Sequence, residues 1–345
     1  MTRIKVWSKP EDFRIELLET EGRYFIAIEH YSGNDEKVIV PSSFASIPVT
    51  AIGSFAFIKN ENLKNIVLPD SLTSIESDAF TGCLNLEEVN LPQSLASIDY
   101  RAFENCRKLS TISLPKELTE IEGDAFSGCV NLFEIIVDKD NPVYASGNGV
   151  LFDKNMTTLI FYPEGKIGEY TVPESVITIE EHAFSNCKKL LQITLPKNLM
   201  AMNSNFYGCE HLGNIEVCKD NAYFSDIEGV LFNKEETILL EYPPGRKNKK
   251  YIIPDKVTHI SANAFNECKW LEHIYIPESI KFIGDRAFSK CERLSEITLL
   301  ANLYIGNEVF KDCPMLKNIN LSEKTKMGYR ALKGFSGEIN YRTYP

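Results

Sequence analysis

Cysteine and histidine are the side chains of this chain best suited to bind zinc, form disulfides or act as nucleophiles. The sequence contains nine cysteines and five histidines. No two cysteines have C-x-x-C spacing, and no two histidines have the spacing of a metal-binding pair. The nearest approach to a ligand pair is Cys209-x-His211, which is too little for a zinc site. We therefore predict no metal.

Eight of the cysteines share one position of an internal repeat: Cys83, Cys106, Cys129, Cys187, Cys209, Cys268, Cys291 and Cys313. Stacked repeats would place them above one another as small apolar core side chains. Vertical neighbours could come within disulfide range, but the parallel Cβ vectors of a buried ladder disfavour the bond. We predict reduced, buried thiols, with Cys218 standing apart at a proline position.

Other polar stretches suggest chemistry only weakly. Asp138-Lys139-Asp140-Asn141 lacks the glycine and the closing glutamate of a calcium loop, so we expect a polar turn. Gly147-Asn148-Gly149 does not continue into the G-x-G-x-x-G phosphate motif. The basic run 245–250 predicts a solvated loop, with an anion contact as the alternative. No Ser/His/Asp, Cys/His or paired-carboxylate arrangement stands out, so we predict no catalytic residue, no cofactor and no enzyme.

A short repeat positions the eight cysteines and most of the chain. An Ala-Phe pair marks its period, since Phe57, Phe80 and Phe103 are each 23 residues apart. Each unit follows I-x-x-x-A-F-x-x-C-x-x-L-x-x-I-x-L-P-x-x-L-x-x. The alternation in L-x-x-I-x-L predicts a short, half-buried strand that the proline ends. One such unit cannot bury its own apolar residues, so the repeats must stack into a solenoid.

Between each repeat's first isoleucine and its cysteine we expect one helical turn. Glycine or asparagine, which tolerate the left-handed conformation that closes a helix, precedes the cysteine in five copies. These residues are Gly82, Asn105, Gly128, Asn186 and Gly208.

The combination of L-x-x-I-x-L-P with A-F-x-x-C resembles the leucine-rich repeat of the BspA-like family of bacterial and protozoan proteins. The resemblance covers roughly residues 38 to 321. It implies an α/β repeat fold: a curved, right-handed solenoid with a concave parallel β-sheet and short helical turns on the convex side. It also implies surface adhesion or host interaction.

The chain divides into three predicted parts. Residues 1–37 form an N-terminal β-hairpin cap, because two alternating runs flank the turn Glu21-Gly22-Arg23. Residues 38–321 form the solenoid, and residues 322–345 a C-terminal cap. Stretched repeats near residues 144–172 and 223–254 share a G-V-L-F motif and predict hairpins in place of the helical turn.

Composition limits partners and location. A net charge of -11 argues against nucleic acid, whose phosphates need a basic face. No window approaches about 18 uninterrupted apolar residues, so we predict no membrane span. The first residues lack the apolar core of a signal peptide, which predicts a cytoplasmic chain as it reads. The family resemblance instead implies the cell surface or secretion, if an upstream signal has been removed.

Strand positions that flank the buried isoleucine or valine should point outward and form a binding face. Apolar residues interrupt this face near its middle, whereas the end positions Lys64 and Asn320 are expected outside the contact. Scattered exposed apolar residues are common, so a face without a partner is the alternative. The predicted binding residues are Phe133, Glu134, Ile136, Leu191, Gln192, Thr194, Asn214, Glu216, His273 and Tyr275.

We therefore predict a non-catalytic protein-binding scaffold that acts in protein–protein interaction or adhesion through the concave sheet, with a host protein among the partners. Two alternatives remain open. One is an intracellular structural or assembly module, and the other is a glycan-binding surface module, which would want more exposed aromatic residues than this face offers.

Overall fold

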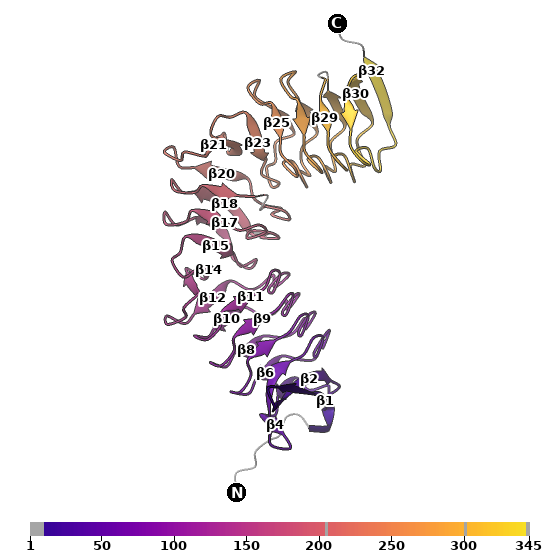
Figure 1. Ribbon diagram of the computed structural model, residues 1–345. Helices are drawn as coiled ribbons and strands as arrows, with labels where there is room; N and C mark the ends of the chain where they lie inside the picture. Colours follow the sequence, from indigo (N-terminus) through magenta and orange to yellow (C-terminus); the bar gives the residue numbers. More distant parts are fainter. Residues whose placement is uncertain (1–9, 204–205, 300–301, 343–345) are drawn as a thin grey trace. The chain divides into compact units, whose positions relative to one another are not determined.

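The computed structural model describes residues 10–203, 206–299 and 302–342, which belong to two compact units, residues 1–166 and 167–345 (Figure 1). Within the described residues the only helix is the 3-10 helix η1, Pro10–Asp12, and the other elements are strands. None of the described helices is long and apolar enough to cross a membrane. The fold is a β-solenoid of stacked parallel strands, so the α/β class and the helical turns expected from the sequence are not confirmed.

Each regular repeat contributes two strands to two different sheets. The L-x-x-I-x-L segment forms the motif strand, as in β8, Glu88–Asn90, where only the central Val89 is buried. A second, two-residue return strand contains the isoleucine that opens the next repeat, as in β9, Ser97–Ile98. Both kinds of strand pair in parallel, and in register, with their counterparts in neighbouring repeats. The sequence pattern predicted the motif strand but not the return strand.

In the first unit, the motif strands form the sheets β3-β6-β8 and β10-β12. Their bounds are β3 Lys37–Ile39, β6 Asn65–Val67, β10 Thr111–Leu114 and β12 Glu134–Val137, besides β8. An N-terminal hairpin of β1, Phe13–Thr20, and β2, Arg23–Tyr31, begins the return sheet, in which β2 runs parallel to β5. The return strands are β5 Ile47–Ile52, β7 Ser74–Ile75, β9 and β11 Glu120–Ile121, and β4 Ser43–Phe44 pairs with β5.

In the second unit, the motif strands form the sheets β16-β18-β20 and β24-β26-β28-β30-β32. The first has the strands β16 Gly168–Thr171, β18 Leu190–Leu195 and β20 Asn214–Val217. The second has β24 Lys250–Ile252, β26 His273–Tyr275, β28 Glu296–Leu299, β30 Asn318–Ser322 and β32 Glu338–Arg342. The return strands are β17 Thr178–Ile179, β19 Ala201–Met202, β25 His259–Ile260, β27 Phe282–Ile283, β29 Tyr304–Ile305 and β31 Lys326–Met327.

The segment between a return strand and its cysteine makes successive tight turns in place of the expected helical turn. Asp78 and Gly82 both have left-handed backbone, with φ of 58° and 76°, and such residues interrupt a right-handed helix. The Phe80 amide donates to the Ala102 carbonyl of the next repeat, at 2.8 Å, instead of to a carbonyl four residues earlier. Hydrogen bonds between repeats therefore alternate with turn hydrogen bonds within the repeat, as from the Ala79 amide to the Glu76 carbonyl. The left-handed conformation predicted before the cysteine is present at Gly82, Asn105, Gly128, Asn186 and Gly208.

The repeat phenylalanines stack inside both units. Phe80 and Phe103 have ring centroids 5.2 Å apart, in a series that also includes Phe57 and Phe126. In the second unit, Phe265 and Phe288 stack at 4.9 Å, and Phe310 follows. Stacked rings at these distances attract each other beyond the area that they bury.

The repeat cysteines lie beside this stack. Eight are buried, Cys218 is partly exposed, and all nine are free thiols. The Cys83 Sγ donates to the Phe57 carbonyl of the preceding repeat at 3.0 Å, and the Cys291 Sγ to the Phe265 carbonyl at 3.1 Å. Burial raises the pKa of the Cys83 thiol to about 12. The predicted ladder of buried thiols is therefore part of the core.

In each stretched repeat, three antiparallel strands replace the turns. They are β13 Tyr144–Gly147, β14 Val150–Asp153 and β15 Thr158–Phe161 in the first unit, and β21 Phe224–Ile227, β22 Val230–Asn233 and β23 Ile238–Glu241 in the second. The tip of the hairpin lies against the preceding motif strand: the Ile135 amide donates to the Gly149 carbonyl at 3.0 Å, and the Ile215 amide to the Gly229 carbonyl at 3.1 Å. These tips occupy the outer edges of β12 and β20. The motif sheets therefore end at these strands.

A buried asparagine leads into each stretched repeat. The Asn141 side-chain amide donates to the carbonyls of Pro115 and Leu118, both at 2.8 Å, and its oxygen accepts from the amides of Val143 and Tyr144. The second unit repeats the arrangement with Asn221, Pro196, Leu199, Tyr223 and Phe224. The polar turn predicted at 138–141 is thus joined to the preceding repeat through a fully bonded side chain.

Candidate functional site

The outward side chains of the motif strands form the candidate binding face. The predicted residues fall in both units, and those of the second unit belong to its two motif sheets. Phe133, Glu134 and Ile136 belong to the first unit, and the second contains Leu191, Gln192, Thr194, Asn214, Glu216, His273 and Tyr275. The large apolar ones among them are exposed, whereas Glu134, Gln192, Thr194, Asn214 and His273 are half-buried.

In the first unit, two apolar side chains at β12 face solvent: Phe133 directly before the strand and Ile136 within it. Phe133 is 48% exposed and Ile136 is 46% exposed, although Ile135 between them is buried. Ile136 lies beside Ser113 of β10 in the register of the sheet. The Lys166 ammonium donates to the Phe133 carbonyl at 3.4 Å, which joins this backbone to the end of the stretched repeat. The backbone here is held in place while the two side chains stay available.

In the second unit, polar residues of β18 and β20 form one hydrogen-bond network. The Asn214 side-chain amide donates to the Gln192 Oε1 at 3.1 Å and to the Glu216 Oε1 at 3.0 Å. Thr194 lies next to Glu216 in the register. This part of the predicted face is therefore polar and internally bonded, and Leu191, 49% exposed, is its large apolar residue.

The most exposed apolar pair of the face lies on β24 and β26. Ile252 and Tyr275 are direct neighbours in the parallel register and are 70% and 57% exposed. Sequence reasoning found Tyr275 but missed Ile252, because the stretched repeat obscures the alignment. Ile252 precedes Ile253-Pro254 as Tyr275 precedes Ile276-Pro277, and this signal could have identified it.

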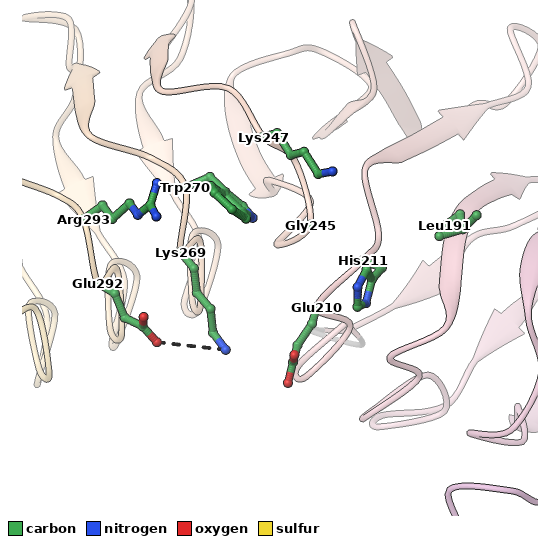
Figure 2. Close-up of a pocket in the computed structure, with 9 residues that line it drawn as sticks. All are labelled: Leu191, Glu210, His211, Gly245, Lys247, Lys269, Trp270, Glu292 and Arg293. Carbon is green, nitrogen blue, oxygen red and sulfur yellow. Dashed lines mark ion pairs between the residues drawn. The ribbon is translucent and has the colours of Figure 1, made fainter.

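A pocket of about 440 Å³ lies where the stretched repeat interrupts the second unit (Figure 2). Its volume is within the usual range of small-ligand sites. Repeats before the interruption, the end of the stretched repeat, and the repeats after it all contribute to the lining. These residues are Leu191, Glu210, His211, Gly245, Lys247, Lys269, Trp270, Glu292 and Arg293.

Trp270 is the aromatic residue of this pocket and is 38% exposed. The Arg293 guanidinium lies over its ring, 4.6 Å from the centroid. Trp270 and Arg293 occupy the same repeat position, two residues after Cys268 and Cys291, in consecutive repeats. The repeat pattern alone could therefore have predicted this contact.

The acidic residues of the pocket are already paired with lysines. Glu292 lies 4.0 Å from the Lys269 ammonium, and Glu210 lies 2.9 Å from the Lys188 ammonium. The hydrogen bond from Lys188 holds the pKa of Glu210 below its usual value.

The close approach of two backbones shapes the pocket at Gly245. Its amide donates to the Leu212 carbonyl at 2.8 Å. A Cβ at this position would lie 2.3 Å from the carbonyl carbon of His211, so only glycine fits. The basic run that begins here is partly anchored, because Arg246 donates to the Glu228 carbonyl and Lys249 pairs with Glu272 at 3.0 Å. Lys247 projects from it into the pocket lining.

Two other sequence expectations can be compared with the structure. Asn320 lies on the outward face beside Thr298, as expected, but it is not exposed. It is 7% exposed, and its side-chain amide donates to Glu296 at 3.0 Å and to Thr298 at 3.1 Å on the neighbouring strand. Cys209 and His211, the nearest approach to a ligand pair, each bond to a backbone carbonyl. The Cys209 thiol donates to the Phe184 carbonyl, and the His211 imidazole contacts the Lys188 carbonyl. Among the described residues, no three His, Cys, Asp or Glu side chains gather as a possible metal site.

Comparison with known families identifies the repeat. A family model described as the BspA type leucine rich repeat region matches six copies, over residues 50–164, 154–238 and 245–345. The chain belongs to the BspA-type leucine-rich repeat family. The resemblance in the sequence is thus confirmed, and BspA-type repeats generally form binding scaffolds. No curated protein is significantly similar to the chain.

Solved structures of bacterial leucine-rich repeat proteins have the same fold. A leucine-rich cell surface protein from Faecalibacterium prausnitzii A2-165 is 22% identical, with a TM-score of 0.58 over 98% of this chain and 95% of that one. A leucine-rich repeat protein from Eubacterium ventriosum is 20% identical, with a TM-score of 0.56 over 96% and 94%. The pneumococcal vaccine antigen PcpA is 20% identical, with a TM-score of 0.50 over 99% and 89%. At these identities the likeness is one of fold.

Proposed function

We propose that the chain is a non-catalytic scaffold that binds a protein through the motif-sheet face of its second unit. The observation that carries this proposal is the pair Ile252 and Tyr275, which are neighbours in the register and 70% and 57% exposed. These two side chains do not pack in the core, because Tyr251 and Ile274 occupy the inward positions of the same strands. Burying the pair against a partner would remove apolar surface from water.

The residues around this pair are of the types that dominate protein interfaces. Trp, Tyr and Arg are enriched among the residues that contribute most binding energy. Tyr275 supplies the tyrosine on β26, and Trp270 and Arg293 supply the other two types in the pocket lining. Strands held by parallel ladders present these groups with little loss of freedom on binding, which favours affinity.

Exposed aromatic residues also occur on the return sheet of this unit, but they are arranged differently. Phe282 and Tyr304 stack on each other with ring centroids 5.6 Å apart and an interplanar angle of 3°. Their faces are turned toward each other, so they offer little flat surface to a sugar ring. This arrangement supports a protein partner over a glycan.

The proposal also includes a contact area on the first unit and a role in adhesion. Phe133 and Ile136 would form a separate contact area on the first unit. Adhesion to a host protein at the cell surface is the role we propose, and the description of the Faecalibacterium prausnitzii relative as a cell surface protein supports it.

The test is a comparative capture experiment. The immobilised chain would be exposed to secreted and matrix proteins of a host and, separately, to the lysate of its own cells, and bound proteins identified by mass spectrometry. Tyr275→Glu and Ile252→Glu should each abolish capture of a partner without changing the melting temperature. Asn340→Glu, an exposed motif-strand residue of β32, is the matched control and should retain the partner.

A partner that all three variants retain equally would contradict the assignment of the face. Capture of no protein from either source would contradict the protein-binding function itself.

A further inference from the structure

The pocket beside the motif face has a cationic end. Lys247 and Arg293 line it, and in Figure 2 Trp270 lies between them, with its indole nitrogen on the side away from Arg293. Within the described ranges, neither Lys247 nor Arg293 has a carboxylate at ion-pair distance. Lys269, in contrast, is paired with Glu292. Glu272 is the nearby carboxylate: the hydrogen bond from Lys249 and, to a smaller extent, the charge of Arg293 lower its pKa, and its ion pair is with Lys249 at 3.0 Å. Lys247 and Arg293 therefore each keep donors for a ligand.

We propose that this end of the pocket binds one carboxylate side chain, an aspartate or a glutamate, of the protein that the motif face holds. The inference rests on the proposed function. The Lys247 ammonium and the Arg293 guanidinium supply charge-assisted donors, and the Trp270 N–H supplies a neutral one. The indole also keeps Arg293 in place through its contact with the ring at 4.6 Å.

The other charges around the pocket select a single anionic group over a polyanion. Glu210 and Glu292 also line the pocket and lie below Trp270 in the view of Figure 2. On the adjoining strands, Glu296 is exposed and Glu216 faces solvent. A sulfated glycan or a nucleic acid would bring several of its charges against these carboxylates, and like charges disfavour such a ligand. One carboxylate on an otherwise neutral segment meets only the cationic end.

Binding at this site can be followed by the fluorescence of Trp270. It contains two tryptophans, Trp7 and Trp270, so that Trp7→Phe, outside the described residues, leaves Trp270 as the only one. In this background, N-acetyl-glutamate amide would be titrated at constant ionic strength while the tryptophan emission is followed. We expect a saturable change. The neutral isostere N-acetyl-glutamine amide should produce none.

Variants identify the residues that bind the carboxylate. Lys247→Gln and Arg293→Gln should each weaken binding of the glutamate probe about tenfold, the loss expected when a charged hydrogen bond is removed. Lys281→Gln, an exposed lysine of the same unit that does not line the pocket, should leave binding unchanged. A response equal for both probes, or one retained in both pocket variants, would overturn the site.

Two further measurements separate the possible outcomes. A heparin tetrasaccharide or inorganic phosphate that binds more tightly than the glutamate probe would contradict the choice of a carboxylate. Tyr275→Ser should leave the glutamate response intact, because Tyr275 does not line the pocket. Failure of the probe to bind while partner capture still depends on Tyr275 would refute the pocket and leave the proposed function standing.

Discussion

At the scale of single residues, burial makes the repeat cysteines both core side chains and poor nucleophiles. The Cys83 thiol is buried, and this burial raises its pKa from 9.0 to about 12. The folded chain therefore holds this proton more tightly than the unfolded chain. The stabilisation is fully present below pH 9.0 and is lost as the pH rises toward about 12.

We expect the free energy of unfolding to fall as the pH is raised from about 9 to about 12, in part through the buried thiols. Urea denaturation at several alkaline pH values would measure it. Cys83→Ala should flatten the dependence, since it removes one of the titrating groups. The same substitution at the partly exposed Cys218 is the control and should change it little. An identical pH dependence in wild type and Cys83→Ala would contradict this account.

At the scale of the element, each repeat is held by stacking on its two neighbours. Phe103 is fully buried and stacks between Phe80 and Phe126, at 5.2 Å and 5.8 Å. Contacts of this kind couple only adjacent repeats, so damage to one should spread little along the chain.

Phe103→Ala should lower the free energy of unfolding by about 3–5 kcal/mol, because it leaves a cavity in the stack. Hydrogen exchange should become faster mainly between residues 80 and 126. Substitution of the exposed Phe133 to alanine is the control and should cost far less. Exchange that rose equally throughout the chain would indicate one shared core instead of a stack of coupled repeats.

The stretched repeats provide a second prediction at this scale. Asn221→Ala should cost at least about 2 kcal/mol, because it removes four hydrogen bonds and leaves buried backbone groups unpaired. Thermal and urea unfolding would measure the loss. Asn198→Ala, at an exposed asparagine with a bond to the Glu174 carbonyl, should cost less than about 1 kcal/mol. Equal losses of unfolding free energy in the two variants would contradict this role of the Asn221 hydrogen bonds.

The sequence predicted those elements whose signal lies within one repeat. The alternation around Val89 predicted β8, and Gly82 predicted the left-handed residue before the cysteine. The helical turn was wrongly expected, because the left-handed φ of Asp78 depends on hydrogen bonds to the next repeat. The return strands were missed since two residues are too few to show a period.

The candidate site was less predictable for a related reason. Tyr275 was found because its own strand marks it as outward. The pocket was not found, because Lys247 comes from the end of the stretched repeat, which the regular pattern does not align with the repeats of Trp270 and Arg293. The buried state of Asn320 likewise depends on Glu296 of a neighbouring strand.

At the scale of the whole molecule, the scaffold combines regular and interrupted repeats within each unit. Regular repeats build motif sheets, and the hairpin tips end those sheets at β12 and β20. In the second unit, Trp270 of the pocket and the exposed pair Ile252 and Tyr275 all follow the hairpin of the stretched repeat. The right-handed coil implied by the family resemblance stays a prediction. The interruption, on this account, creates the binding surface.

Oxidative footprinting of the chain with and without its captured partner tests this central claim most directly, because hydroxyl radicals modify exposed aromatic side chains. The partner should protect Tyr275 and Trp270 from oxidation and leave Phe282 and Tyr304 of the return sheet as reactive as before, since the exposed faces differ. Protection of Phe282 and Tyr304 with Tyr275 and Trp270 unchanged would contradict the account and place the binding site on the return sheet.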